Sequence, residues 1–146
     1  MSEPYGLQRF VDAQAEHYAQ VLEEIRQGCK RSHWMWFVFP QVDGLGVSEM
    51  ARYYAIKSRA EAEAYLRHPV LGARLIECAN AVLSVQGRTA FEIFGRPDDL
   101  KLRSCATLFA SVSEPQSVFQ RLLDRYFQGR PDHATLQRLR TLSPEP

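Results

Sequence analysis

The chain has 146 residues, a mass of 16.7 kDa and a formal net charge of +1, with 18 lysines and arginines against 17 aspartates and glutamates. A chain of this length buries enough surface to fold around one core without metals or disulfides, so we expect a single globular domain. The balanced charge excludes the bulk electrostatic attraction that holds a protein to nucleic acid or to an anionic membrane. We therefore expect neither as a partner.

The cysteines and histidines give no sign of a metal or cofactor. Cys29, Cys78 and Cys105 are odd in number and have no Cys-X-X-Cys spacing, and the four histidines form no metal-binding motif. The beginning of the chain lacks the basic and apolar runs of a signal peptide, and the longest stretch without a charged residue, residues 32–42, is too short to span a bilayer. We expect a cytoplasmic protein with no cofactor and no metal.

In chain order, the first predicted element is an amphipathic helix. Apolar residues from Phe10 to Ile25 recur at spacings of three, four and seven, and the helix ends near Gly28. Residues 33–40 are too apolar for a surface loop, and Pro40 disfavours helix in the residue before it. This pattern predicts a buried extended segment, in which Trp34 and Trp36 face the same side.

A glycine turn and a short helix follow. Gly44 and Gly46 mark the turn, and Ser48 can cap a helix that runs to Ala55. In that helix three residues are expected to point inward: Met50, Tyr53 and Tyr54.

The rest of the chain predicts further helices with short connections. Ser58 and Thr89 each begin a capping box, the second of which opens only a short helix, and Pro69 opens a longer helix that ends near Val85. Asp98 or Asp99 can cap the next helix, and later helices open near residues 114–115 and at Asp132. The expected fold class is mainly α: seven or eight helices with at most one or two short strands, in one domain over residues 1–142 followed by a flexible tail at 143–146.

The tryptophans of residues 33–40 have two interpretations. Trp34 and Trp36 lie beside Lys30, Arg31 and His33, and aromatic rings next to cations suit stacking on a nucleobase. Large aromatic side chains also fill the cores of small domains. The sequence leaves both interpretations open.

Glu49 is a candidate catalytic carboxylate. It follows the turn formed by residues 44–46, and a glycine turn at a helix N-terminus is a natural anion site. A carboxylate in that first turn repels phosphate, but it could act as a general base or stabilise a cationic sugar. The alternative is an ordinary first-turn helix acid.

Residues 98–104 form a second concentration of polar side chains. If Asp98 caps the helix, Lys101 and Ser104 follow at helical spacing and could face one site together with an aspartate. The alternative is a helix cap followed by surface charge. Cys105 has no neighbouring base in the sequence and is expected to be a core thiol.

The run from Gly28 to Gln41, followed by residues 44–48, resembles the hallmark of domain-of-unknown-function family 1810, whose members often carry the label calpastatin. The resemblance continues through residues 54–56, 61–62, 65–66, 68–69, 71–72, 74–75, 94–95, 98–102 and 107–109, so that it covers nearly the whole chain. It implies a single, mainly helical domain.

Residues 48–57 are also similar to a Ser-Glu-His-Tyr-Tyr motif of the NADAR, or YbiA-like, N-glycosidases, which act on ADP-ribose conjugates and ribosylamines. Their active-site Glu and Lys match Glu49 and Lys57, and Met50 stands where that group has histidine. The resemblance implies an N-glycosidic-bond hydrolase.

Three functional hypotheses follow. In the first, the protein is an N-glycosidase-like hydrolase of a nucleotide- or ADP-ribose-derived ribosyl compound, with Glu49 and Asp99 as the catalytic carboxylates. Its substrate-binding residues would be His33, Trp34, Trp36, Gln41, Gly46, Tyr53, Lys57 and Lys101. In the second, the same pocket belongs to a non-catalytic module that binds a small nucleotide-like ligand or a protein. In the third, the aromatic segment is entirely core and the protein is structural; the oligomeric state is left open.

Overall fold

Helices account for nearly all the regular structure in the computed structural model, which describes residues 4–142. Over that range they are α1 (Gln8–Ala15), α2 (Tyr18–Arg26), α3 (Met35–Val38), α4 (Glu49–Tyr53), α5 (Arg59–Arg67), α6 (Leu71–Ser84), α7 (Ala90–Phe94), α8 (Asp98–Ala110), α9 (Val118–Phe127) and α10 (His133–Thr141). Extended pairing in the described part of the chain is limited to one isolated parallel bridge between Val42 and Ile56. The mainly α prediction is confirmed, with ten helices where seven or eight were expected. The expected tail at residues 143–146 lies outside the described residues.

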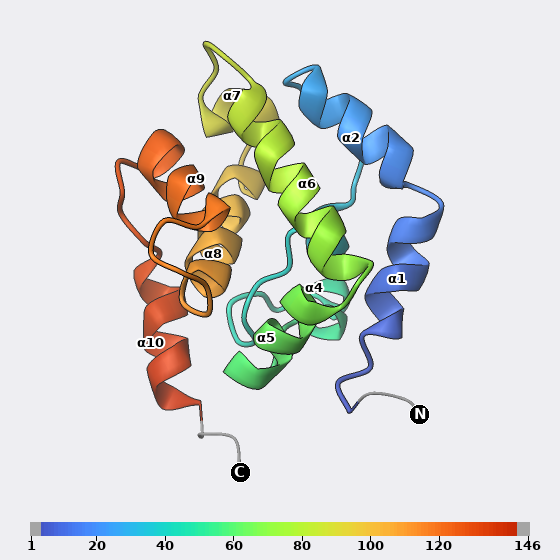
Figure 1. Ribbon diagram of the computed structural model, residues 1–146, viewed down its shortest axis with the longest axis vertical. Coiled ribbons are helices and arrows are strands. Elements are labelled where there is room, and N and C mark those ends of the chain that lie inside the picture. The colour runs from blue at the N-terminus through green and yellow to red at the C-terminus, as the bar shows by residue number, and fades with distance from the viewer. Residues whose placement is uncertain (1–3, 143–146) are drawn as a thin grey trace.

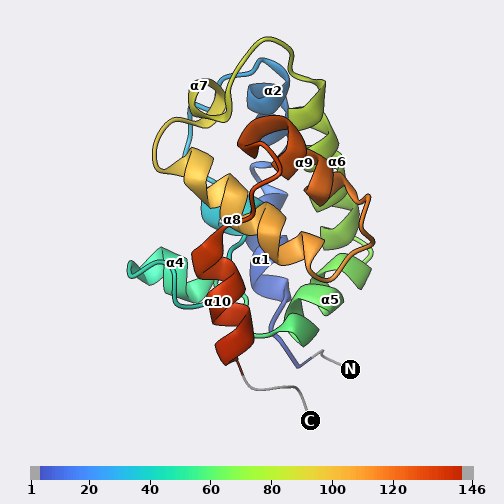
Figure 2. The same cartoon turned by 90° about the vertical axis from the view of Figure 1, so that its left-hand side faces the viewer.

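Two long helices organise the packing. Helix α6 packs against α2, α5 and α9, and α8 packs against α5, α7, α9 and α10 (Figures 1 and 2). Because α8 lies between these neighbours, eight of its residues are buried, and apolar ones such as Leu102, Cys105 and Phe109 face the core. Figure 2 shows α10 beginning beside the middle of α8 and extending away from it, with α4 at the side of the molecule next to α10.

Side-chain caps set several helix starts where the sequence predicted them. The side chains of Ser48 and Asp132 accept hydrogen bonds from backbone N–H groups three residues further on. Thr89 and Glu92 form the full, reciprocal capping box. Ser58 caps α5, but the Glu61 carboxylate accepts from the Lys57 backbone N–H and pairs with Arg9, so only half of that predicted box is present.

The single amphipathic helix predicted for residues 10–25 is wrong. The segment is divided into α1 and α2, because the His17 N–H bonds the Gln14 carbonyl three residues back and tightens the chain there. Each half then has its own polar anchor. The Gln14 amide donates to the Phe37 carbonyl at 2.6 Å, and the Tyr18 hydroxyl donates to the Arg74 carbonyl at 3.3 Å.

The extended segment predicted for residues 33–40 is also wrong in its backbone. Residues 35–38 form the one-turn helix α3, and the effect of Pro40 reaches only Phe39, which leaves the helical region at φ −124° and ψ 72°. In a helical turn, side chains two residues apart point to roughly opposite sides, so Trp34 is buried at 2% exposure and Trp36 is only partly buried. The prediction that both tryptophans share one face therefore fails, while the predicted burial of the segment is correct.

Helix α4 points its apolar residues outward, contrary to expectation. Met50 is 40% exposed and Tyr53 is 59% exposed, because α4 lies on the surface and ends before Ala55. Of the three residues expected to point inward, only Tyr54 does so, and its ring packs against those of Phe10 and Phe37.

One buried carboxylate, that of Glu24, fixes the segment between α2 and α3. Its oxygens accept from the Trp34 indole N–H at 2.9 Å, the backbone N–H groups of Arg31 and Ser32, the Ser32 hydroxyl and the Gln20 amide. Burial alone would raise the pKa of Glu24, but the hydrogen bonds outweigh it and lower that pKa to about 2. The path of residues 31–34 is therefore fixed by hydrogen bonds to the charged Glu24 carboxylate.

Replacing Glu24 by Gln should lower the free energy of unfolding by about 2–4 kcal/mol, because an amide offers one acceptor oxygen to five donors. Urea unfolding at pH 7 measures this difference, with exposed Glu23→Gln as the control on the same helix. Equal effects of the two substitutions would contradict the role assigned to Glu24.

The stability difference between the wild-type protein and Glu24→Gln should depend on pH. A carboxylate with a lowered folded-state pKa stabilises the fold fully above its ordinary pKa, and that stabilisation is lost as the pH falls towards about 2. The difference should therefore shrink to roughly half near pH 3. A difference that stays constant between pH 7 and pH 3 would show that the carboxylate charge is not what stabilises the segment.

Candidate functional site

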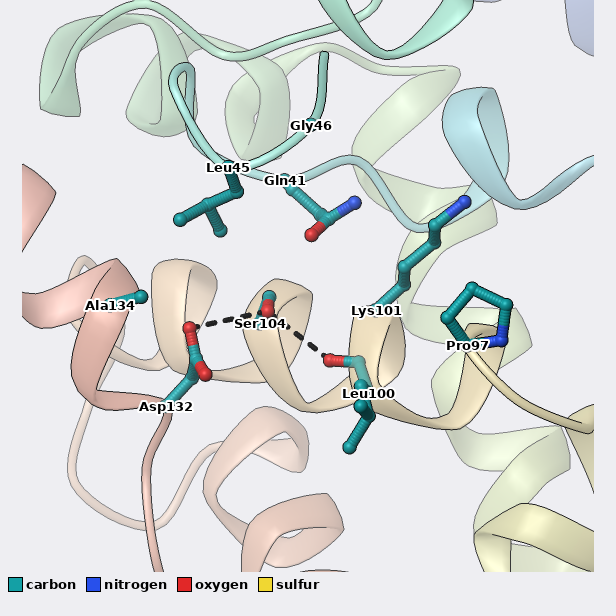
Figure 3. A pocket seen from close by; sticks show the side chains of 9 residues that line it. All are labelled: Gln41, Leu45, Gly46, Pro97, Leu100, Lys101, Ser104, Asp132 and Ala134. Atoms are coloured by element: carbon teal, nitrogen blue, oxygen red, sulfur yellow. Dashed lines mark hydrogen bonds between the residues drawn. The ribbon is translucent and has the colours of Figure 1, made fainter. Parts of the chain in front are cut away.

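A small hollow of about 280 Å³ opens where the 41–46 segment, the start of α8 and the start of α10 meet. Its lining residues are Gln41, Leu45, Gly46, Pro97, Leu100, Lys101, Ser104, Asp132 and Ala134, and it is called the α8 hollow below (Figure 3). Leu45, Pro97, Leu100 and Ala134 make its walls largely apolar. Few polar groups converge on it, as in binding sites for small molecules.

The 41–46 segment is fixed from two sides. The Gln41 carbonyl accepts from the Ile56 N–H at 2.8 Å, and the Asp43 carbonyl accepts from Arg138 Nε of α10 at 2.9 Å. Gly44 has a φ of +98°, and a Cβ placed there would lie 2.4 Å from Arg138 Nε. The positive φ favours glycine here, and any other side chain would also have to displace the Arg138 guanidinium that holds the segment.

Two polar side chains of the α8 hollow have unused hydrogen-bonding capacity. Within residues 4–142, the Gln41 amide and the Lys101 ammonium make no side-chain hydrogen bond; the ammonium has only the Asp98 carboxylate at 3.7 Å and the Trp36 ring at 5.2 Å. Figure 3 shows the Gln41 amide extending towards α8 and Lys101 reaching up from α8 beside it. An amide and an ammonium are thus available to a ligand at the same opening.

The floor of the α8 hollow is a polar pair. The Ser104 hydroxyl lies 3.3 Å from an Asp132 carboxylate oxygen, which also accepts from the Thr135 backbone N–H at 2.9 Å as the α10 cap. Ser104 also donates to the Leu100 carbonyl at 3.2 Å. These bonds hold the floor in place and join α8 to α10.

Asp98 connects the α8 hollow to the segment that Glu24 organises. Its carboxylate lies 2.8 Å from the Lys30 ammonium and 3.7 Å from that of Lys101. Lys30 is only 6% exposed and also donates to the Ser32 carbonyl, with its ammonium 5.0 Å from the centre of the Trp34 ring. Two lysines therefore share one carboxylate, and one of them faces the hollow.

The structure brings some of the predicted site residues together. Gln41, Gly46 and Lys101 line the α8 hollow, and Trp36 contacts Lys101 at its edge. Lys101 and Ser104 both line the hollow, as their helical spacing suggested. Asp98 lies within the first turn of α8 without capping it and does not line the hollow; the aspartate that does is Asp132 of the α10 cap.

Other predicted site residues lie elsewhere. Trp34 is buried in the core with its N–H on Glu24, so its indole belongs to the fold, and His33 is exposed beside it. Tyr53 and Lys57 are exposed on or after α4; the Lys57 ammonium donates to the Arg52 carbonyl and lies 3.5 Å from an Asp43 oxygen.

The two predicted catalytic carboxylates do not share a site. Glu49 is exposed in the first turn of α4. Asp99 is buried at 4% exposure and accepts from Arg96 Nε at 3.1 and 3.2 Å on its two oxygens. Neither residue lines the α8 hollow. The carboxylate that does line it, Asp132, attracted attention in the sequence only as a helix cap.

Sequence reasoning also missed how Glu24, Lys30 and Asp98 are connected. Each is a charged residue in a region of charged residues, and no local signal marks it as buried. One clue was available for Lys30, because it lies only two positions before the longest uncharged stretch of the chain, residues 32–42.

Two cysteines are poor candidates for nucleophilic chemistry. Burial raises the pKa of Cys78 to about 12 and that of Cys105 well above its ordinary value, so the reactive thiolate is suppressed at both. Cys105 is 1% exposed, which confirms the prediction that it is a core thiol. In the described residues there is no group of three or more His, Cys, Asp or Glu side chains placed to hold a metal ion, and no helix has the length and hydrophobicity needed to cross a membrane.

The fold and the hollow together define a small, mainly helical domain with a polar opening at a junction of three segments. The chain belongs to the family described as protein of unknown function (DUF1810), whose model matches residues 4–139. It is similar to the conserved hypothetical protein Rv1873 from Mycobacterium tuberculosis, known from a crystal structure, with 52% sequence identity and a TM-score of 0.93 over 95% of this chain and 99% of that one. A comparison with curated proteins gave no match.

Asp99→Asn should lower the free energy of unfolding by about 1–3 kcal/mol, because it weakens a buried, charged acceptor of the Arg96 guanidinium. Glu49→Gln should change it by no more than about 0.5 kcal/mol, since Glu49 is exposed. Chemical unfolding of both variants measures this. A stable Asp99→Asn protein would contradict the structural role assigned to that carboxylate.

Proposed function

We propose that the protein is a non-catalytic binding module for a small, nucleotide-like molecule, and that the ligand occupies the α8 hollow. The observation that carries the proposal is the pairing of the Gln41 amide and the Lys101 ammonium at one opening, each with unused donors. An ammonium is a point charge suited to a phosphate or carboxylate, and an amide can both donate to and accept from the edge of a base.

The dimensions of the hollow limit the ligand. A volume of about 280 Å³ lies just below the usual range for small-molecule pockets, so the hollow suits a group no larger than a nucleoside. The apolar walls formed by Leu45, Pro97 and Leu100 would contact a planar ring, while Lys101 at the rim would take an anionic group. A larger ligand such as ADP-ribose would extend beyond the hollow towards Trp36.

The N-glycosidase-like hydrolase is the alternative. It requires a carboxylate beside the scissile bond, and the residue placed to supply one at the α8 hollow is Asp132. Two hydrogen bonds from Thr135 and one from Ser104 already engage one oxygen of that carboxylate. The binding module is preferred because Asp132 already caps α10 and the lining of the hollow holds no second carboxylate for the pair that glycosidic hydrolysis ordinarily uses. The two functions differ in whether a product forms.

Isothermal titration calorimetry with AMP, adenosine and ADP-ribose tests the proposal. Lys101→Met should weaken AMP binding about tenfold, the effect of losing one charge-assisted interaction, and should affect adenosine less. Gln41→Leu should weaken both ligands without lowering stability, because the Gln41 amide makes no hydrogen bond within residues 4–142. Mass spectrometry of the same mixtures detects any cleaved product.

The matched control is Lys57→Met, which removes the same charge from an exposed lysine outside the α8 hollow. It should leave AMP affinity unchanged. Product formation that persists in Glu49→Gln and stops in Asp132→Asn would replace the binding module by a hydrolase. Failure of all three ligands to bind, or equal losses in Lys57→Met and Lys101→Met, would overturn the proposal.

A further inference from the structure

A second hollow, of about 320 Å³, lies where the α6–α7 connection meets the end of α9. It is lined by Gly87, Arg88, Thr89, Arg125 and Tyr126 and is called the arginine hollow below. In Figure 1 the α6–α7 connection lies at the top of the molecule, whereas α4 and α10 lie in its lower half. The two hollows share no lining residue.

Arg125 is held in place as part of the wall. Its guanidinium donates to the Leu83 carbonyl at 2.7 Å and to the Val85 carbonyl at 2.9 Å, at the end of α6. The Tyr126 hydroxyl donates to the Val82 carbonyl at 2.7 Å on the same helix end. A guanidinium has five N–H donors, so Arg125 retains unused donors in a fixed orientation.

The aliphatic part of the Arg88 side chain is packed, whereas its guanidinium has unused hydrogen-bond donors. Its Cδ lies 3.1 Å from where a Cβ on Gly28 would stand, so the stem packs closely over that glycine. Within residues 4–142 its guanidinium makes no hydrogen bond and no ion pair. The nearby acid in sequence, Glu92, is engaged by the Thr89 backbone N–H at 2.8 Å in the capping box.

The result is an uncompensated pair of cations. Neither Arg88 nor Arg125 has a carboxylate within 4 Å among the described residues, although the chain as a whole carries a net charge of only +1. Arg88 and Arg125 are both exposed, whereas the more deeply buried cations Arg9 and Lys30 are each paired with a carboxylate, that of Glu61 and that of Asp98. Two unpaired guanidiniums lining one hollow therefore favour an anion from outside the chain.

We propose that the arginine hollow is a binding site for a phosphate group, held between the Arg88 and Arg125 guanidiniums. The planar fork of a guanidinium matches the oxygens of a phosphate in pairs, which a lysine cannot do. Tyr126 contributes a ring at the wall, so a phosphate ester with an apolar or aromatic group is accommodated as well as the free ion. This site is independent of the ligand proposed for the α8 hollow.

The test is an NMR titration of the arginine side-chain N–H resonances with inorganic phosphate and with phenyl phosphate, at constant ionic strength set by chloride. Saturable shifts at Arg88 and Arg125 are expected, and Arg88→Gln should weaken binding about fivefold or more. Tighter binding of phenyl phosphate would support a phosphate ester as the ligand, and equal binding would support the free ion. Arg88→Lys should only partly restore affinity, because it keeps the charge and loses the fork.

Arg67→Gln is the matched control, since Arg67 is an exposed arginine on α5 that does not line the arginine hollow. It should leave phosphate binding unchanged, and so should Lys101→Met in the α8 hollow. Shifts that do not saturate, or an equal loss of affinity in Arg67→Gln and Arg88→Gln, would show diffuse charge attraction and would overturn the proposal.

Discussion

The arrangement of the α8 hollow depends on the hydrogen bonds that the buried carboxylate of Glu24 accepts. A buried charge is costly unless hydrogen bonds replace its water, and here donors from Gln20, Arg31, Ser32 and Trp34 do so. Because three of those residues belong to the segment between α2 and α3, satisfying one charge fixes the path of that segment. The depressed pKa of Glu24 expresses the same balance, in which hydrogen bonds outweigh burial.

Two ion pairs and one cation–π contact connect that segment to the α8 hollow. Lys30 leaves the segment, donates to the Ser32 carbonyl and pairs with Asp98 at 2.8 Å at the start of α8. Asp98 then lies 3.7 Å from Lys101, whose ammonium faces the Trp36 ring. The position of Lys101 in the α8 hollow therefore depends, through Asp98 and Lys30, on the buried carboxylate of Glu24.

Local rules predicted the fold class and several helix starts. The hydroxyl and carboxylate caps at Ser48, Thr89 and Asp132 depend only on residues within one turn, so the sequence is sufficient to locate them. The split between α1 and α2 could not be predicted in this way, because its anchors on Phe37 and Arg74 are distant in sequence. The exposure of Met50 and Tyr53 depends likewise on where α4 lies on the surface.

The candidate site could be predicted in part, for a related reason. Lys101 and Ser104 face one opening because helical spacing places them on one side of α8, and that is visible in the sequence. Pairing Glu49 with Asp99 required a tertiary contact that local patterns do not contain. In the structure the Asp99 carboxylate accepts hydrogen bonds from Arg96, and Glu49 is exposed on the surface. Trp34 and Trp36 were both predicted to bind substrate. In the helical turn of α3 they face different sides, so Trp34 is part of the core and Trp36 contacts Lys101 at the hollow.

A small ligand is expected to bind between the 41–46 segment and the start of α8. Backbone chemical-shift mapping by NMR during a titration with AMP shows whether it does. The largest shifts should fall on Gln41, Gly46, Lys101 and Ser104, with little change at Glu49 and Lys57. Shifts concentrated on residues 49–57, or no shifts with any nucleotide, would contradict this expectation.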